Sequence, residues 1–73
     1  MEKVMLPFGQ RLRELRKEKG LKQTEMAQFL GCTDRNYQKM EYGEINIPAL
    51  TLIKLSDFFE VTLDYLVGRT DQR

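Results

Sequence analysis

The chain has 73 residues, 41% of them hydrophobic and 32% charged, and its net charge is +1, which predicts one folded domain and excludes a disordered chain. No apolar run approaches the ~20 residues of a membrane span and no signal peptide opens the chain, so we expect a cytoplasmic protein. Histidine is absent, Cys32 is the single cysteine, and no carboxylates are paired by spacing, so we expect no internal disulfide, no metal, no cofactor and no enzyme.

The first predicted element is an amphipathic helix from Phe8 to Gly20. Phe8, Leu12 and Leu15 recur at i, i+4 and i+7, and residues 1–6 before them show no periodicity and are expected to form an arm. Arg16 shares the inward stripe of this helix. Because a cation that faces a core is costly unless it is paired, we expect an acidic partner elsewhere in the fold.

Positive charge is concentrated in the first part of the chain. Residues 1 to 22 hold seven Lys and Arg against three Glu, a sum of +4, whereas residues 23 to 73 hold five against eight acids, a sum of −3. Attraction to phosphate depends on local clusters of charge more than on the total. A basic first helix therefore suits a nucleic-acid-binding protein, although a solvated helix face explains the same pattern.

The stretch from Gln23 to Tyr42 predicts two short helices folded tightly about Gly31. Met26, Ala27 and Leu30 form one apolar stripe on a helix from Leu21 to Leu30. Gly31 suits the left-handed position just past a helix end. Cys32 beside it is expected to be a small buried hydrophobic residue.

A second helix is predicted from Thr33 to Gly43, with Thr33 as a plausible N-cap and Asp34 near the positive end of the helix dipole. Its inward positions include Tyr37, Met40 and Glu41. Glu41 is the one acid on that face and is therefore the candidate partner of Arg16. Successive steps of 100° place polar and partly cationic side chains on the opposite, outer face, namely Arg35, Lys39 and Tyr42, flanked by Asn36 and Gln38.

Two further helices complete the chain. Pro48 is well placed at the start of a helix that runs to Phe59, and Thr62 is the expected cap of a short helix from Leu63 to Gly68. Residues 69–73 are expected to be a frayed tail. The predicted organisation is thus an arm at 1–6, one domain at 7–68 and a tail at 69–73.

The chain resembles the helix-turn-helix family of phage repressors, Cro proteins and bacterial regulators similar to the xenobiotic-response-element type. The most specific matches are Gln23, Ala27, Gly31, Glu41, Gly43 and the run from Leu63 to Gly68. The resemblance implies an all-α, compact five-helix lambda-repressor-like domain with the helix-turn-helix at helices 2 and 3. It also implies a transcriptional regulator, expected to be a repressor, that binds double-stranded DNA with helix 3 in the major groove.

The resemblance assigns roles to individual residues. Gln23 matches a phosphate-binding glutamine, and the residues matching Arg16 and Glu41 pair and help to place the DNA backbone. On the outer face, Arg35 can bond guanine, Lys39 a neighbouring guanine or a phosphate, and Asn36 adenine. The full set of expected DNA contacts is Arg16, Gln23, Thr33, Asp34, Arg35, Asn36, Gln38, Lys39 and Tyr42.

Two acids depart from the family pattern. Asp34 stands where relatives often contact bases, and it can either accept a bond from cytosine N4 or act only on the helix dipole. Glu44 follows helix 3 where many relatives have a base, which puts a phosphate contact there in doubt. These acids leave open an alternative function, a protein-interaction module that kept the fold without DNA binding.

The fifth helix is expected to be a dimer contact. Leu63, Tyr65 and Leu66 lie in the part of the chain that meets its twin in many dimers of the family, although core packing is an equal alternative for Tyr65. We expect a weak homodimer that is strengthened on a palindromic operator. No membrane contact and no small-molecule ligand are expected.

Overall fold

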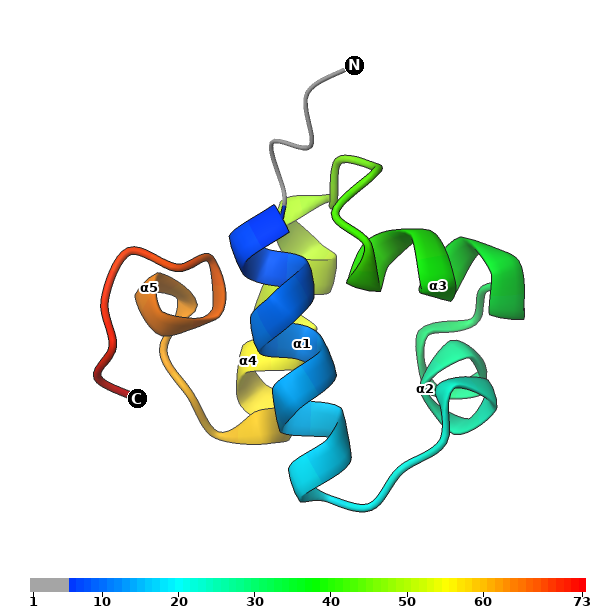
Figure 1. Cartoon of the computed structure of the whole chain (residues 1–73), viewed down its shortest axis with the longest axis horizontal. Coiled ribbons are helices and arrows are strands. Elements are labelled where there is room, and N and C mark those ends of the chain that lie inside the picture. Colours follow the sequence, from blue (N-terminus) through cyan, green and yellow to red (C-terminus); the bar gives the residue numbers. More distant parts are fainter. Residues whose placement is uncertain (1–5) are drawn as a thin grey trace.

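Five helices and no strand make up residues 6–73, the part of the chain that the computed structural model describes. The helices are α1 (Leu6–Glu18), α2 (Gln23–Leu30), α3 (Asp34–Glu41), α4 (Ala49–Phe59) and α5 (Leu63–Leu66) (Figure 1). The predicted all-α, five-helix fold is confirmed. None of these helices combines the length and apolar character needed to cross a membrane.

The helix ends at Leu30, Phe59 and Leu63 are as predicted, and the others differ by one or two residues. The first helix begins at Leu6, within the predicted arm. Pro7 is tolerated in this first turn because the N–H that proline lacks would have no partner within the helix. Residues 1–5 of the predicted arm lie outside the described residues. Pro48 is the N-cap of α4 rather than its first residue, since its ψ of 146° is extended. The last helix ends at Leu66, two residues before the predicted Gly68.

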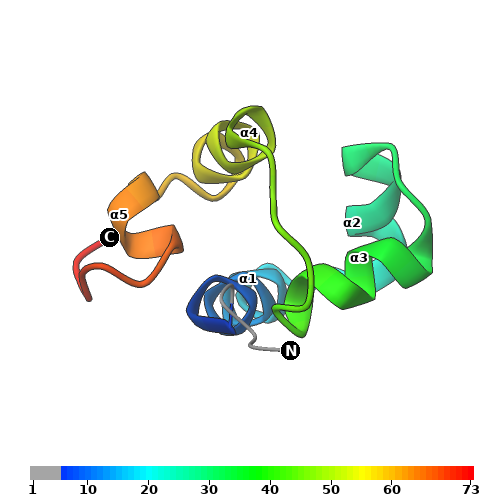
Figure 2. The same cartoon turned by 90° about the horizontal axis from the view of Figure 1, so that it is seen from above.

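α1 occupies the centre of the fold. In Figure 1, α2 and α3 lie on one side of it and α5 on the other, and Figure 2 shows α4 on a further side. Contacts join α1 to α3 and to α5, α2 to α3, and α4 to α5. Their inward side chains form one core, made of Phe8, Leu12, Leu15, Met26, Ala27, Tyr37, Met40, Leu55, Phe59, Tyr65 and Leu66.

A close approach of α1 and α3 depends on Gly9, which the sequence pattern does not single out. A Cβ atom at this position would overlap the carbonyl oxygen of Glu41 and lie 2.8 Å from the carbonyl oxygen of Met40. The backbones of the two helices are therefore nearly in contact here. Only a residue without a side chain fits between them.

The C-terminal tail, predicted to fray, contacts α1 through exposed side chains in the structure. The guanidinium of Arg11 donates to Asp71 at 2.8 Å and to the Thr70 carbonyl at 3.2 Å, and it stacks over the ring of Tyr65 at 4.0 Å. Arg73 in turn pairs with Glu18 of α1. These contacts join residues that are more than fifty positions apart, which is why local sequence patterns did not reveal them.

Candidate nucleic-acid interface

The turn between α2 and α3 brings the two helices together over three residues. Gly31 has a φ of 71°, in the left-handed region, and its N–H donates to the Gln28 carbonyl at 3.2 Å. The N–H of Cys32 donates to the Ala27 carbonyl at 3.0 Å. These bonds complete the end of α2 and let α3 begin at residue 34.

The N-terminus of α3 is capped by Thr33, as the sequence predicts. The Thr33 hydroxyl oxygen accepts a hydrogen bond from the Asn36 N–H at 3.1 Å. Asp34 follows as the first helical residue, with an exposed side chain. The cap is thus supplied by Thr33, and the Asp34 carboxylate is not needed for it.

The outer face of α3 carries the side chains that the sequence assigned to DNA contact. Lys39 is partly buried, and the others are exposed, namely Asp34, Arg35, Asn36, Gln38 and Tyr42. The inward residues Tyr37, Met40 and Glu41 are buried. The predicted division of this helix into a core face and a polar outer face therefore matches the observed burial.

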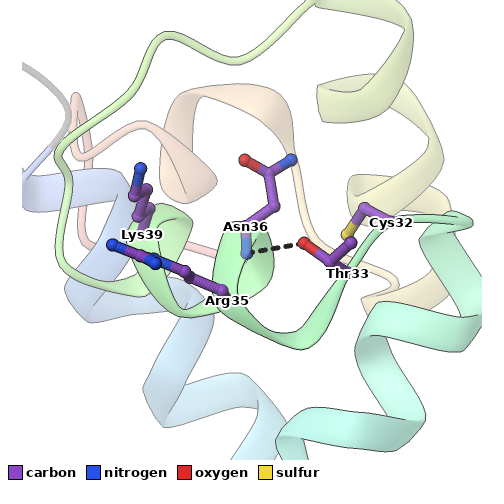
Figure 3. A pocket seen from close by; sticks show the side chains of 5 residues that line it. All are labelled: Cys32, Thr33, Arg35, Asn36 and Lys39. Carbon is purple, nitrogen blue, oxygen red and sulfur yellow. Dashed lines mark hydrogen bonds between the residues drawn. The ribbon is translucent and has the colours of Figure 1, made fainter.

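A shallow, open hollow lies along the first turns of α3, lined by Cys32, Thr33, Arg35, Asn36 and Lys39. In Figure 3 the side chains of Arg35 and Lys39 extend toward the same side of α3, while the Asn36 amide extends toward a different side. Two cationic groups one turn apart create a positive region beside the hollow. Such a surface can contact phosphate oxygens and the acceptor atoms of guanine.

Cys32 lies at the edge of this hollow and is half-buried, so it is less enclosed than predicted. Burial raises the pKa of the Cys32 thiol above its ordinary value. The thiol is therefore protonated at neutral pH. Its contribution to the site is packing.

Arg16 and Glu41 join α1 to α3 through an ion pair. The distance from Arg16 Nε to Glu41 Oε2 is 2.6 Å, and the side chains are only 11% and 3% exposed. Arg16 also donates to the Leu21 carbonyl at 2.8 Å, so this guanidinium is fixed from two sides. The inward cation and the inward acid of the sequence pattern therefore meet in the fold.

Gln23, the first residue of α2, is part of the same network. Its Nε2 donates to Glu41 Oε1 at 3.1 Å, so one of its two amide hydrogens is already used. The second hydrogen of that NH₂ group stays available for a phosphate oxygen. Glu41 thus holds Gln23 at the N-terminus of α2, where backbone N–H groups also favour an anion.

The charges in this network are stable at neutral pH. Burial alone would raise the pKa of Glu41, but hydrogen bonds from Arg16 and Gln23 outweigh it and hold that pKa below its ordinary value. Burial, together with the Glu41 carboxylate, raises the pKa of Tyr37 far above its ordinary value. The buried Tyr37 hydroxyl lies beside the Arg16–Glu41 pair without a hydrogen bond of standard geometry among the described residues, and it stays uncharged at neutral pH.

The predicted dimer contact on α5 needs correction. Tyr65 and Leu66 are only 6% and 0% exposed within a single copy, so both belong to the core. Leu63 alone of the three is accessible, at 43%. A four-residue helix that packs on α1 and α4 buries two of its apolar side chains and leaves few for a partner.

An apolar surface that the sequence analysis missed lies on the outer side of α4. Leu50 is 80% exposed and Ile53 is 44% exposed. They precede Asp57 at i, i+3 and i+7, which places all three on one helical face, opposite the buried Leu55. The sequence shows this spacing, but it does not show which apolar stripe of α4 other helices cover and which stays exposed.

The sequence of the chain matches a known protein family. The helix-turn-helix family model matches residues 12–66. An SPbeta prophage-derived HTH-type transcriptional regulator of Bacillus subtilis, YonR, is 43% identical over 63 residues, which are 86% of this chain and 58% of the relative. The HTH-type transcriptional regulator ImmR of the same organism is 33% identical over 66 residues, 90% of this chain and 52% of the relative. The chain thus spans little more than half the length of these relatives.

A solved structure agrees with these sequence relatives. The restriction-modification controller protein C.AhdI from Aeromonas hydrophila is 34% identical and superimposes with a TM-score of 0.72. The alignment covers 85% of this chain and 94% of that protein. The similarity therefore includes nearly the whole controller protein.

Proposed function

The chain belongs to the helix-turn-helix family, and on that basis we propose that it is a transcriptional regulator, acting as a repressor, that binds a specific double-stranded DNA operator. The observation that supports this most is the exposed outer face of α3, where Arg35 and Lys39 lie one turn apart. The Arg16–Glu41 ion pair fixes α3 against α1. In this proposal α3 enters the major groove while Gln23 contacts a phosphate.

Arg35 is the proposed reader of guanine. Replacing Arg35 with alanine is expected to cost about 1–3 kcal/mol on the best duplex and to relax the preference at one base pair, because two hydrogen bonds to O6 and N7 are lost. Binding titrations over single-base variants of the selected duplex measure both effects. Arg69→Ala removes one exposed cation away from α3 and serves as the matched control, with unchanged base preferences. Equal weakening on every duplex would make Arg35 a phosphate contact instead.

The rival function is a protein-interaction module that kept the fold without DNA binding. The exposed acids Asp34 and Glu44 near the two ends of α3 favour this alternative, because both repel phosphate. Binding to bulk DNA at low salt discriminates the two functions. A DNA-binding regulator is expected to bind and to lose affinity steeply as salt rises, whereas the rival module has little affinity at any salt concentration.

We also propose that two copies bind one operator. A single short helix contacts few base pairs, and a half-site competes with an excess of non-specific DNA, so two copies are needed for useful selectivity. Two-fold symmetry would place half-sites on the order of 10 base pairs apart. Self-association in solution is weak in this proposal, and adjacent half-sites strengthen it by making the second contact effectively intramolecular.

The surface proposed for the copy-to-copy contact is the outer side of α4. Leu50 and Ile53 supply exposed apolar area. Lys54 and Asp57 lie on the same side of α4 with opposite charges, and within one copy Lys54 Nζ donates to the Phe29 carbonyl at 3.2 Å. Two antiparallel copies related by a two-fold axis would bring this cation of one copy toward Asp57 of the other. This self-complementary charge pattern favours a second copy over an unrelated partner.

Leu50→Ser is expected to weaken binding to a duplex with two half-sites roughly 100-fold and to leave single half-site binding unchanged, because the avidity of the pair is lost. Sedimentation with each duplex measures the number of copies bound. Since Leu50 is 80% exposed, the substitution leaves the core intact. Gln28→Ser, at an exposed position of α2, is the control. Unchanged recruitment of a second copy by the Leu50 variant would remove α4 from the contact.

A further inference from the structure

Asp34 is an exposed acid at the leading end of a helix that is otherwise suited to DNA. Thr33 supplies the N-cap oxygen at 3.1 Å from the Asn36 nitrogen, so the carboxylate of Asp34 has no capping bond to make. Within residues 6–73 no hydrogen bond or ion pair includes this carboxylate. It therefore stands free at the end of α3.

The position of Asp34 on the helix does not let its carboxylate neutralise the charge of the neighbouring Arg35. Arg35 follows it directly, and side chains at i and i+1 point 100° apart on a helix, so they do not face each other. The same rotation sets Asp34 and Gln38 on one side of Arg35, with Lys39 and Asn36 on the other. Asp34 and Arg35 thus present opposite charges to different parts of any surface that α3 meets.

The chemistry of the major groove limits what a carboxylate can accept there. Phosphate oxygens, guanine N7 and O6 and thymine O4 are all acceptors, and each repels the charge. Adenine offers a donor at N6, but its N7 acceptor lies beside that donor. Cytosine N4 is the donor whose neighbourhood suits a carboxylate best.

From this arrangement we propose that Asp34 determines specificity by selecting cytosine next to the guanine taken by Arg35, and that it does so at the expense of overall affinity. The inference rests on the proposed DNA-binding function and adds the chemical role of this residue. A carboxylate that finds no cytosine is desolvated beside acceptors and phosphates, which penalises every other sequence. Asp34 therefore acts mainly by rejecting incorrect duplexes.

Three forms of the chain test this role on a library of random duplexes: the unmodified chain, Asp34→Asn and Asp34→Ala. We expect the unmodified chain to prefer cytosine at one position about tenfold. Asp34→Ala should lose that preference, and Asp34→Asn should shift it toward adenine, since an amide can bond N6 and N7 together. Both variants should bind unrelated duplexes more tightly than the unmodified chain does.

Glu44→Gln is the matched control, because it also removes one exposed negative charge but lies beyond the end of α3. It should raise general binding and leave the base preferences unchanged. Ratios of affinity between duplexes are unaffected by the fraction of folded protein, so a loss of helix stability in the Asp34 variants cannot imitate the expected result.

Identical base preferences in all forms would overturn the inference and leave the proposed function standing. If the unmodified chain selects no duplex at all, the proposed function fails and the role of Asp34 fails with it.

Discussion

Glu41→Ala is expected to destabilise the fold by about 3 kcal/mol, because it leaves the Arg16 guanidinium without its carboxylate in a site that water scarcely reaches. Arg16 is 11% exposed in its side chain, and its remaining bond is to the Leu21 carbonyl. For a domain of this size, that loss lowers the melting temperature by more than roughly 10 °C. Urea or thermal unfolding followed by circular dichroism measures it.

A double-mutant cycle that combines Glu41→Ala with Arg16→Ala isolates the interaction free energy between these two side chains from their other contacts. A coupling free energy of about 0.5–3 kcal/mol is expected, whereas additive losses would show that the two side chains do not interact in solution. Glu44→Ala removes an exposed acid and should change stability by less than about 0.5 kcal/mol. Any loss of DNA binding in the Glu41 and Arg16 variants is partly indirect, since the pair holds α3 against α1.

The contribution of this pair should also depend on pH in one direction. The pKa of Glu41 is lowered in the fold, so its stabilisation is complete above the unfolded-state value of about 4.3 and is lost as the pH falls through the lower, folded value. The difference in stability between the unmodified chain and Glu41→Gln is therefore expected to shrink below about pH 4. A constant difference down to lower pH would contradict a charged Glu41.

Gly9→Ala is expected to destabilise the fold by about 3 kcal/mol, although the same change in an open helix would stabilise it by about 1 kcal/mol. The added methyl group would overlap the Glu41 carbonyl oxygen and approach the Met40 carbonyl oxygen to 2.8 Å. Backbone atoms cannot rotate away, so α1 and α3 must separate. Chemical denaturation of the variant measures the cost.

Gln10→Ala provides the comparison for Gly9→Ala, because Gln10 follows Gly9 in the same helix and is exposed. It should leave stability within about 0.5 kcal/mol of the unmodified chain. A stabilised Gly9→Ala variant would mean that the two helices do not approach as closely as the structure has them.

Gly9 and Arg16 together explain how the outer face of α3 is positioned. They are seven residues apart, which is two turns of α1, so both lie on the side of α1 that faces α3. Gly9 lets the backbones approach near Glu41, and Arg16 binds the Glu41 side chain. A change in either contact would tilt α3 and move Arg35 and Lys39 relative to the rest of the surface.

Sequence reasoning succeeded where a local cause decides the outcome. Thr33 caps α3 and Gly31 ends α2 because caps and left-handed positions depend on a few neighbouring residues. The separation of α3 into inward and outward faces follows from its period. The meeting of Arg16 and Glu41 was also accessible, because a charge on an inward stripe requires a partner and few candidates existed.

The sequence did not distinguish apolar side chains that pack in the core from apolar side chains that stay exposed. Leu66 was assigned to a dimer contact but is buried in one copy, and for Tyr65 the core-packing alternative holds, whereas the exposed Leu50 and Ile53 were not noticed. Apolar side chains at helical spacing look alike whether another helix or a partner covers them. The contacts of the tail with α1 were not anticipated either, because Arg11 and Asp71 lie sixty positions apart and no local pattern relates them.

The sequence by itself therefore determined the five helices, the Thr33 cap of α3, the helix-turn-helix between α2 and α3 and the chemistry of the outer face of α3. These properties follow from interactions within about four residues, which a sequence displays directly. The tertiary structure decided which apolar stripe of α4 is covered and where Gly9 lets the backbones of α1 and α3 approach. Both depend on distances between segments that are remote in the chain, and only the packing of the helices against one another sets those distances.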